Sequence, residues 1–210
     1  MTRAAAALLV VAAVAYSAWL IELVLPDRLS LLQAYVSEYS AVGQPYRGLF
    51  RTTDMIAAVC LLVAALLIAR TVRRSWLVVV GLTILGVAVM ADANFTLDCA
   101  FSVSAQCRTV KEAGVVSWKD HMHVVTSVMS NVGMVVALLG AGLLARRKRW
   151  PWTGVGLIVA TGGSIAVLDP LGPGHFTGGI LRVQLVVVGV ALVLGAWWLV
   201  RGGGAAQPEG

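Results

Sequence analysis

Six long apolar runs constrain this chain more than any other feature of its sequence. They cover residues 4–25, 53–69, 76–95, 121–145, 152–168 and 180–200. About 20 apolar residues cross a bilayer as a helix, so each run is long enough to span one. Only helices and closed barrels satisfy every backbone group inside lipid, and these runs lack the alternating pattern of barrel strands. The sequence therefore predicts an all-α integral membrane six-helix bundle.

The composition agrees with a membrane protein and excludes an ordinary soluble domain. Charged residues make up 12% of the chain, against about 25% in soluble proteins. The formal net charge is +6, but the basic residues stand at the ends of the apolar runs, where they set topology. We therefore expect the lipid bilayer, and not a nucleic acid, as the partner of the basic residues. Residues 1–200 are predicted to form one transmembrane domain, and residues 201–210 a disordered cytoplasmic tail.

The distribution of arginine and lysine predicts the orientation. Arg70, Arg73 and Arg74 lie between the second and third runs, and residues 146–149 between the fourth and fifth are all basic. Short cytoplasmic loops are enriched in such residues. Both termini are therefore expected in the cytoplasm of a multi-pass protein of the cell membrane. Nine of the ten acidic residues then fall on the outer half: Glu22, Asp27, Glu38, Asp54, Asp92, Asp98, Glu112, Asp120 and Asp169.

Two of the three cysteines lie in the second outer loop, and the third lies inside an apolar run. Cys99 and Cys107 are eight residues apart, whereas Cys60 is in the second run. Outer loops face an oxidising compartment, so the pair predicts a disulfide. Closing so short a loop would stabilise the fold by about 2.5 kcal/mol in the chain-entropy model. A two-thiolate metal site is the alternative, although no second cysteine pair accompanies it.

Every apolar run carries an ionisable residue at or near its outer end, and this is the most informative functional feature. Ionisable groups in a membrane are costly and mark functional or structural sites. The residues are Glu22, Asp54, Asp92, His121, His123, Asp169 and Arg182, with His175 in the nearby loop.

One interpretation of this polar cluster is structural, and another is binding. In the structural interpretation the carboxylates pair with Arg47, Arg51, Arg182 or Lys119 and hold the helix ends together. In the binding interpretation the cluster receives a lipid headgroup or a membrane protein partner. The binding residues are then predicted to be Glu38, Asp54, Asp98 and Arg182. Transport is disfavoured because the inner halves of the runs are almost wholly apolar.

A metal-dependent hydrolase acting on outer-leaflet lipid headgroups is the alternative function. His121, His123 and His175 would be the metal ligands, with zinc as the cofactor. Asp92, His123 and His175 would be the catalytic residues, supported by Glu38 or Asp98. Against this, His-x-His places its side chains about 200° apart on a helix. His123, Ser127 and Asn131 recur every fourth residue, so they share one helix face.

Three segments resemble a bacterial membrane family known as domain of unknown function 998. They are residues 36–46, an acidic residue with Cys99 after the third run, and residues 116–123. The resemblance covers most of the chain and implies a compact six-helix bundle with no established activity. It assigns the family motifs to Ser37 and Glu38, and to Ser117, Trp118 and His123, whereas His121 departs from the pattern. The prediction is therefore a structural, lipid-binding or partner-binding role, with the hydrolase as the alternative.

Overall fold

The computed structural model describes residues 1–26, 29–145, 148–171 and 175–201. Within them the chain is helical and contains no strand, which confirms the all-α prediction. The predicted tail beyond residue 201, Asp27, and two of the basic residues at 146–149 lie outside the described part. The helices are α1 (Thr2–Tyr16), η1 (Ala18–Val24), η2 (Val36–Ser40), α2 (Arg47–Thr71), α3 (Trp76–Asn94), α4 (Ala105–Glu112), α5 (Trp118–Leu144), α6 (Trp150–Leu168), η3 (Asp169–Leu171) and α7 (Thr177–Val200).

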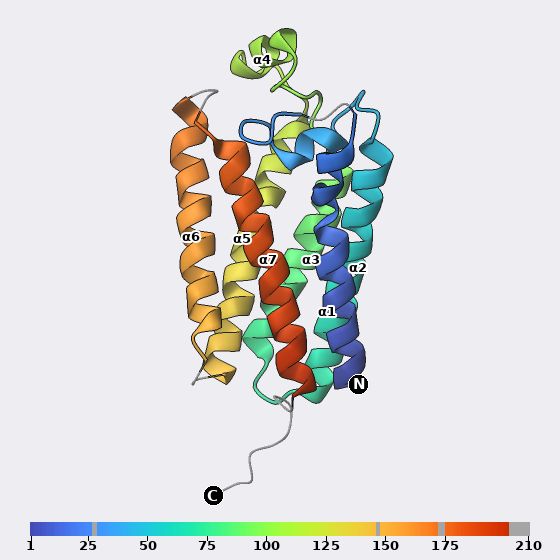
Figure 1. Ribbon diagram of the computed structural model, residues 1–210, viewed down its shortest axis with the longest axis vertical. Coiled ribbons are helices and arrows are strands. Elements are labelled where there is room, and N and C mark those ends of the chain that lie inside the picture. Colours follow the sequence, from blue (N-terminus) through green and yellow to red (C-terminus); the bar gives the residue numbers. More distant parts are fainter. Residues whose placement is uncertain (27–28, 146–147, 172–174, 202–210) are drawn as a thin grey trace, which may run out of the picture.

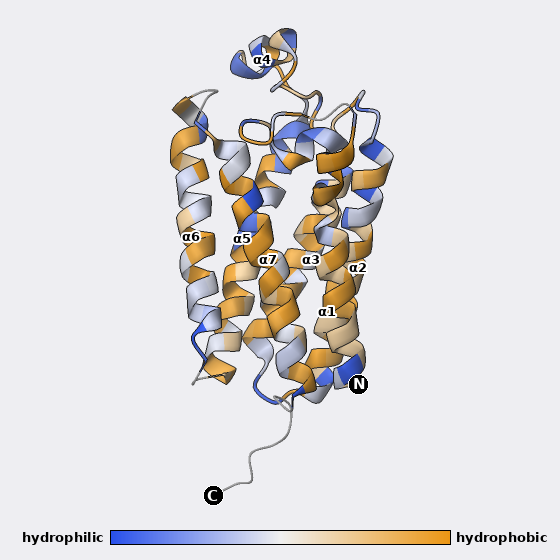
Figure 2. Cartoon of the chain, in the orientation of Figure 1, coloured by the Kyte–Doolittle hydropathy of each residue, from blue (hydrophilic) through white to orange (hydrophobic). Residues whose placement is uncertain are grey.

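Six helical segments of the described residues are long and apolar enough to cross a membrane, as the sequence predicts. The first is α1 continued by η1, and the others are α2, α3, α5, α6 and α7. Figure 2 shows the apolar residues along these helices and the hydrophilic ones gathered toward their ends. The chain is a multi-pass membrane protein.

The six spans form a closed ring. Each packs against its neighbours in sequence, in the order α1, α2, α3, α5, α6 and α7, and α7 returns to pack on α1. Figure 1 shows the spans running along one axis, with α4 beyond one end and the N-terminus at the other. We call the end with η1, η2 and α4 the loop end, and the end where α1 begins and α7 finishes the terminal end.

The α2 span begins at Arg47, several residues before the start predicted at residue 53. Two charged residues in its first turns have partners that the sequence pattern does not show. Arg51 donates to the Ala93 carbonyl at 2.6 Å, and Arg47 to Thr96 Oγ1 at 3.2 Å. Because α3 and the loop after it supply these acceptors, the helix extends through residues that hydropathy alone excludes.

Glycines bring α3 and α5 into backbone contact. A Cβ on Gly81 would lie 2.2 Å from the backbone nitrogen of Ala137, and one on Gly133 would lie 2.5 Å from that of Leu85. A Cβ on Gly140 would lie 2.6 Å from the nitrogen of Val78. Small residues are the usual means of close helix packing in membranes. These glycines therefore fix the α3–α5 contact.

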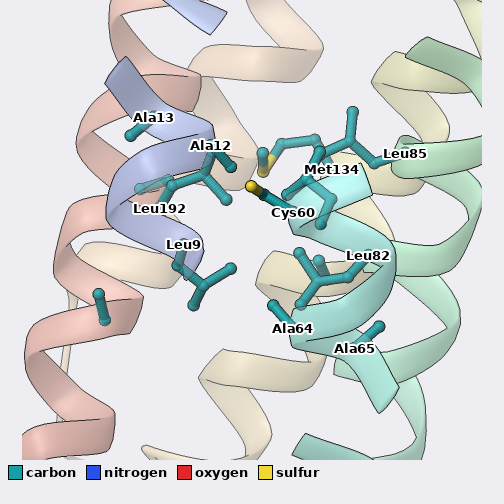
Figure 3. Packing of buried hydrophobic residues seen from close by; sticks show 14 of the residues in the cluster. Leu9, Ala12, Ala13, Cys60, Ala64, Ala65, Leu82, Leu85, Met134 and Leu192 are labelled. Carbon is teal, nitrogen blue, oxygen red and sulfur yellow. The ribbon is translucent and has the colours of Figure 1, made fainter. Parts of the chain in front are cut away.

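Apolar side chains fill the middle of the ring. Figure 3 shows Leu9 and Ala12 of α1 pointing toward Cys60 of α2, with Met134 of α5 and Leu192 of α7 beside them. All five are buried. These side chains make the middle of the ring apolar.

Residues 29–46, which join η1 to α2, close the loop end of the ring, and we call them the cap segment. The Leu29 amide donates to the Tyr39 hydroxyl at 2.7 Å. The Val42 amide donates to the Leu97 carbonyl, and the Gly179 amide to the Leu32 carbonyl, each at 3.0 Å. The cap segment is thus bonded within itself, to the loop after α3 and to the start of α7.

A disulfide holds the loop between α3 and α5, which lies over the cap segment. Cys99 and Cys107 are bonded, with their Cα atoms 6.1 Å apart, which confirms the predicted pairing. The loop that they close carries Ser102, whose amide donates to Glu38 Oε2 of η2 at 2.8 Å. The disulfide loop therefore fastens to the cap segment through a buried carboxylate.

Candidate functional site

Glu22 and Arg182 form a fully buried ion pair between η1 and α7. Arg182 Nε donates to Oε1 of Glu22 and Nη2 donates to Oε2, both at 2.6 Å. The remaining nitrogen, Nη1, donates to the carbonyls of Leu31, Ala34 and Gly178. A buried charge is stable only when it is paired and hydrogen-bonded. These bonds therefore support the structural interpretation for Arg182.

Asp92, near the end of α3, lies against α5. His123 Nδ1 is 3.1 Å from Asp92 Oδ1 and 2.8 Å from the Phe95 carbonyl. Because a carbonyl only accepts, Nδ1 carries the proton. The hydroxyls of Thr126 and Ser127 also donate to the Asp92 carboxylate. Asp92 and His123 are therefore in contact, with hydroxyls as their neighbours.

The three histidines do not come together. His121 is exposed and His123 is buried, as their spacing within α5 requires. His175 is half-buried in the loop before α7. Among residues 1–26, 29–145, 148–171 and 175–201, no three His, Cys, Asp or Glu side chains form a group that could hold a metal ion. The geometry therefore provides no set of three metal ligands at His121, His123 and His175.

Asp98 has a structural place at the start of α5. Its carboxylate accepts from the amide and the hydroxyl of Ser117, each at 2.6 Å. Its own amide donates to Asp120 Oδ2 at 3.1 Å, and Ser117 Oγ accepts from the Asp120 amide. Side-chain acceptors at an N-cap satisfy the free amides of the first helical turn. The family motif around Ser117 is thus a helix cap.

Glu38 is also bonded inside the fold. Its two carboxylate oxygens accept from the amides of Tyr35, at 3.0 Å, and Ser102, at 2.8 Å. Burial raises the pKa of this carboxyl above its ordinary value, and the two amides and the Lys111 charge offset part of that rise. Glu38 therefore holds the cap segment in place.

A polar cavity of roughly 120 Å³ lies on the axis of the ring, directly under the cap segment. Five spans and the cap segment contribute to its wall. A cavity of roughly 150 Å³ admits a molecule the size of benzene, so this space accommodates one small chemical group. Its polar and aromatic lining residues are Tyr16, Trp19, Ser37, Ser40, Phe50, Thr53, Asp54, Asp92, Ser127, Ser130, Asn131 and Gln184.

Asp54 differs from the other predicted binding residues because it faces this cavity without a partner. No described residue donates a hydrogen bond to its carboxylate or forms an ion pair with it. Glu38, Asp98 and Arg182 are bonded within the fold, as described above. Of the four predicted binding residues, Asp54 is thus the one placed to meet a ligand.

A second, apolar cavity of roughly 60 Å³ lies on the terminal side of the first. Its lining includes Leu9, Leu82 and Leu192, and Met134 lines both cavities. The interior of the ring therefore changes from polar to apolar across Met134, along the axis of the spans.

Sequence reasoning missed several lining residues, above all Tyr16 and Gln184. Gln184 lies on α7 and donates to Asn131 Oδ1 at 2.5 Å. Each is a polar residue inside a long apolar run, which is the signal that could have found them. The shared face of Ser127 and Asn131 was predicted, and both line the cavity.

Comparison with known proteins identifies the family. A family profile described as "Protein of unknown function (DUF998)" matches residues 9–203. No curated protein and no solved structure matches the chain. The match confirms the resemblance seen in residues 36–46 and 116–123, and it covers five spans completely and the first from residue 9 onward. The chain belongs to the DUF998 family, whose function is unknown.

Proposed function

We propose that this protein binds an amphiphilic molecule of the membrane inside the helical ring. The polar group of the ligand occupies the cavity beside Asp54 and Asp92, and its apolar part extends past Met134 toward the apolar cavity. The observation that carries the proposal is the stacking of these two cavities on one axis. A polar pocket above an apolar one matches the two ends of an amphiphile, and ligand sites between the helices of a bundle are common.

The metal-dependent hydrolase is less well supported than binding. It needs several convergent ligands with an open position for water, and the described residues provide no group of three. Asp92 and His123 are in contact, but Ser127 bonds to Asp92 and not to the imidazole. Asp92 therefore lies between the hydroxyl and the imidazole, an arrangement in which His123 cannot take the proton of Ser127 directly.

We also propose that the loop end faces outward from the cell membrane and that both termini are cytoplasmic. Arg70, Arg73 and Arg74 at the terminal end support this orientation by the positive-inside rule. The disulfide at the loop end supports it as well, because disulfides persist in oxidising compartments. Labelling of a cysteine introduced at Glu112 by a membrane-impermeant reagent added to intact cells would test the orientation. Failure to label it, with labelling after lysis, would reverse the orientation.

Native mass spectrometry tests the binding proposal. Wild-type protein purified in a mild uncharged detergent is expected to retain one amphiphile per chain. Ala15 lines the polar cavity, so Ala15→Leu should fill part of it and reduce the adduct at least tenfold. Ala7→Leu on the exposed face of the same helix is the matched control and should retain the adduct. Wild-type protein without an adduct, or equal adducts in both variants, would contradict the proposal.

A further inference from the structure

We infer that the polar group bound in the cavity is a cationic ammonium, held between Asp54 and Asp92. This inference rests on the binding proposed above and adds the charge and chemical class of the ligand. It begins from the charges that the chain places around the cavity. Two carboxylates are among its lining residues, and none of the described residues that line it is a lysine, arginine or histidine.

Two arginines at the loop end are bonded to other groups of the protein. Arg182 is paired with Glu22, and Arg51 donates to the Ala93 carbonyl. His123 lies 3.1 Å from Asp92 but is not part of the cavity wall. His123 contacts Asp92 and not Asp54. Asp54 therefore has no countercharge from the described residues.

The two carboxylates also differ in their bonding. Asp92 is oriented by the hydroxyls of Thr126 and Ser127 and by His123. Asp54 has no such donor among the residues that the structure describes. Ionised groups at membrane depth are costly unless they are paired. A ligand cation placed between the two carboxylates would supply a countercharge to both.

The rest of the wall suits an ammonium better than a metal ion. A metal ion needs several oxygen, nitrogen or sulfur ligands at short range, and no group of three acidic, His or Cys side chains is available within the described residues. Tyr16, Trp19 and Phe50 line the same cavity. The faces of aromatic rings attract organic cations, and such cages are a common means of recognising quaternary ammonium groups.

The size of the cavity agrees with this ligand class. Roughly 120 Å³ of space is close to the roughly 150 Å³ that admits benzene. A trimethylammonium group or a short aminoalkyl group is of that size, whereas a sugar ring is larger; an anion such as phosphate would be repelled by the two carboxylates of the wall. Such a group could belong to an amphiphile or to a water-soluble amine.

Titration calorimetry on purified protein in an uncharged detergent distinguishes these cases. The probes are decyltrimethylammonium, decanol and tetramethylammonium, and the proteins are wild type, Asp54→Asn and Glu112→Gln. Glu112→Gln removes an exposed carboxylate at the same end of the molecule. Wild type and Glu112→Gln are expected to bind decyltrimethylammonium at least tenfold more tightly than decanol or tetramethylammonium. Asp54→Asn should reduce the preference for decyltrimethylammonium over decanol about tenfold.

Each other outcome overturns a different claim. Equal affinity of the wild type for decyltrimethylammonium and decanol would overturn the ammonium inference and leave amphiphile binding in place. Equal affinity for tetramethylammonium and decyltrimethylammonium would support the ammonium class and overturn the amphiphile. Binding of none of the three probes by the wild type would overturn both. The wild-type comparison stands even if Asp54→Asn fails to fold.

Discussion

At the scale of single residues, the carboxylates at the loop end divide into those that line the cavity and those that do not. Glu22, Glu38 and Asp98 each accept two or more hydrogen bonds from the protein. Asp54 and Asp92 lie in the cavity wall. All five were prominent in the sequence, but the sequence could not divide them, because their partners come from distant parts of the chain.

The Glu22–Arg182 pair gives a prediction about stability. Arg182→Met leaves a buried, unpaired carboxylate, so it should lower the free energy of unfolding by about 3–5 kcal/mol. The double variant Glu22→Gln with Arg182→Met removes the charge and should be less destabilised than Arg182→Met alone. Thermal unfolding in detergent micelles measures both. A double variant that is no more stable than the single one would show that the charge of Glu22 is not the cause.

The raised pKa of Glu38 predicts a pH dependence. Because the folded-state pKa is above the unfolded value, the folded state binds this proton more tightly. The contribution of Glu38 to stability is therefore full below the unfolded pKa and is lost as the pH rises through the folded pKa. Wild type should gain stability relative to Glu38→Gln as the pH falls across this window. Unfolding midpoints of both proteins at a series of pH values test this prediction. A stability advantage of the wild type over Glu38→Gln that grows as the pH rises would refute it.

At the scale of elements, the glycines of α3 and α5 determine how closely the two helices approach. Gly133→Ala would place a Cβ 2.5 Å from the backbone nitrogen of Leu85. Overpacking of this kind typically costs about 1–3 kcal/mol. Gly156→Ala in α6 is the control, because nothing lies within 4 Å of its added Cβ. Differential scanning calorimetry of the two purified variants should show a lower unfolding temperature for Gly133→Ala alone. Equal unfolding temperatures would disprove the close contact.

The disulfide is an element-scale constraint on the cap segment. Replacing Cys99 and Cys107 with serine should lower stability by about 2.5 kcal/mol, because the bond closes a short loop. The loss should disappear when wild type and variant are both measured under reducing conditions. Chemical unfolding with and without reductant provides the comparison, and a variant as stable as the oxidised wild type would contradict it.

The helices were predictable from the sequence, whereas their inner faces were not. Apolar length located all six spans, but α5 begins at Trp118, before the predicted start at residue 121, because Ser117 caps its first turn. The start of α2 was wrong because Arg47 and Arg51 find acceptors on and after α3. Tyr16 and Gln184 line the cavity only because α1 and α7 close the ring, and that contact joins the two ends of the chain. Hydropathy contains no information about such long-range pairing.

At the scale of the whole molecule, ring closure explains why a small membrane protein has an interior at all. Six spans in a closed ring, with a cap segment over one end, enclose space that a pair or a row of helices would leave open to lipid. The polar part of this space lies near the loop end, and its apolar part lies beyond Met134 toward the terminal end. The polar part of the interior thus lies at the same end of the molecule as most of the carboxylates.

A crystal structure of the wild-type protein grown from a lipid mesophase tests the central claim most directly. We expect one elongated ligand on the ring axis, with its polar group between Asp54 and Asp92 and its apolar part passing Met134. A cavity that holds only water, with lipids confined to the outer surface of the ring, would contradict amphiphile binding by this protein.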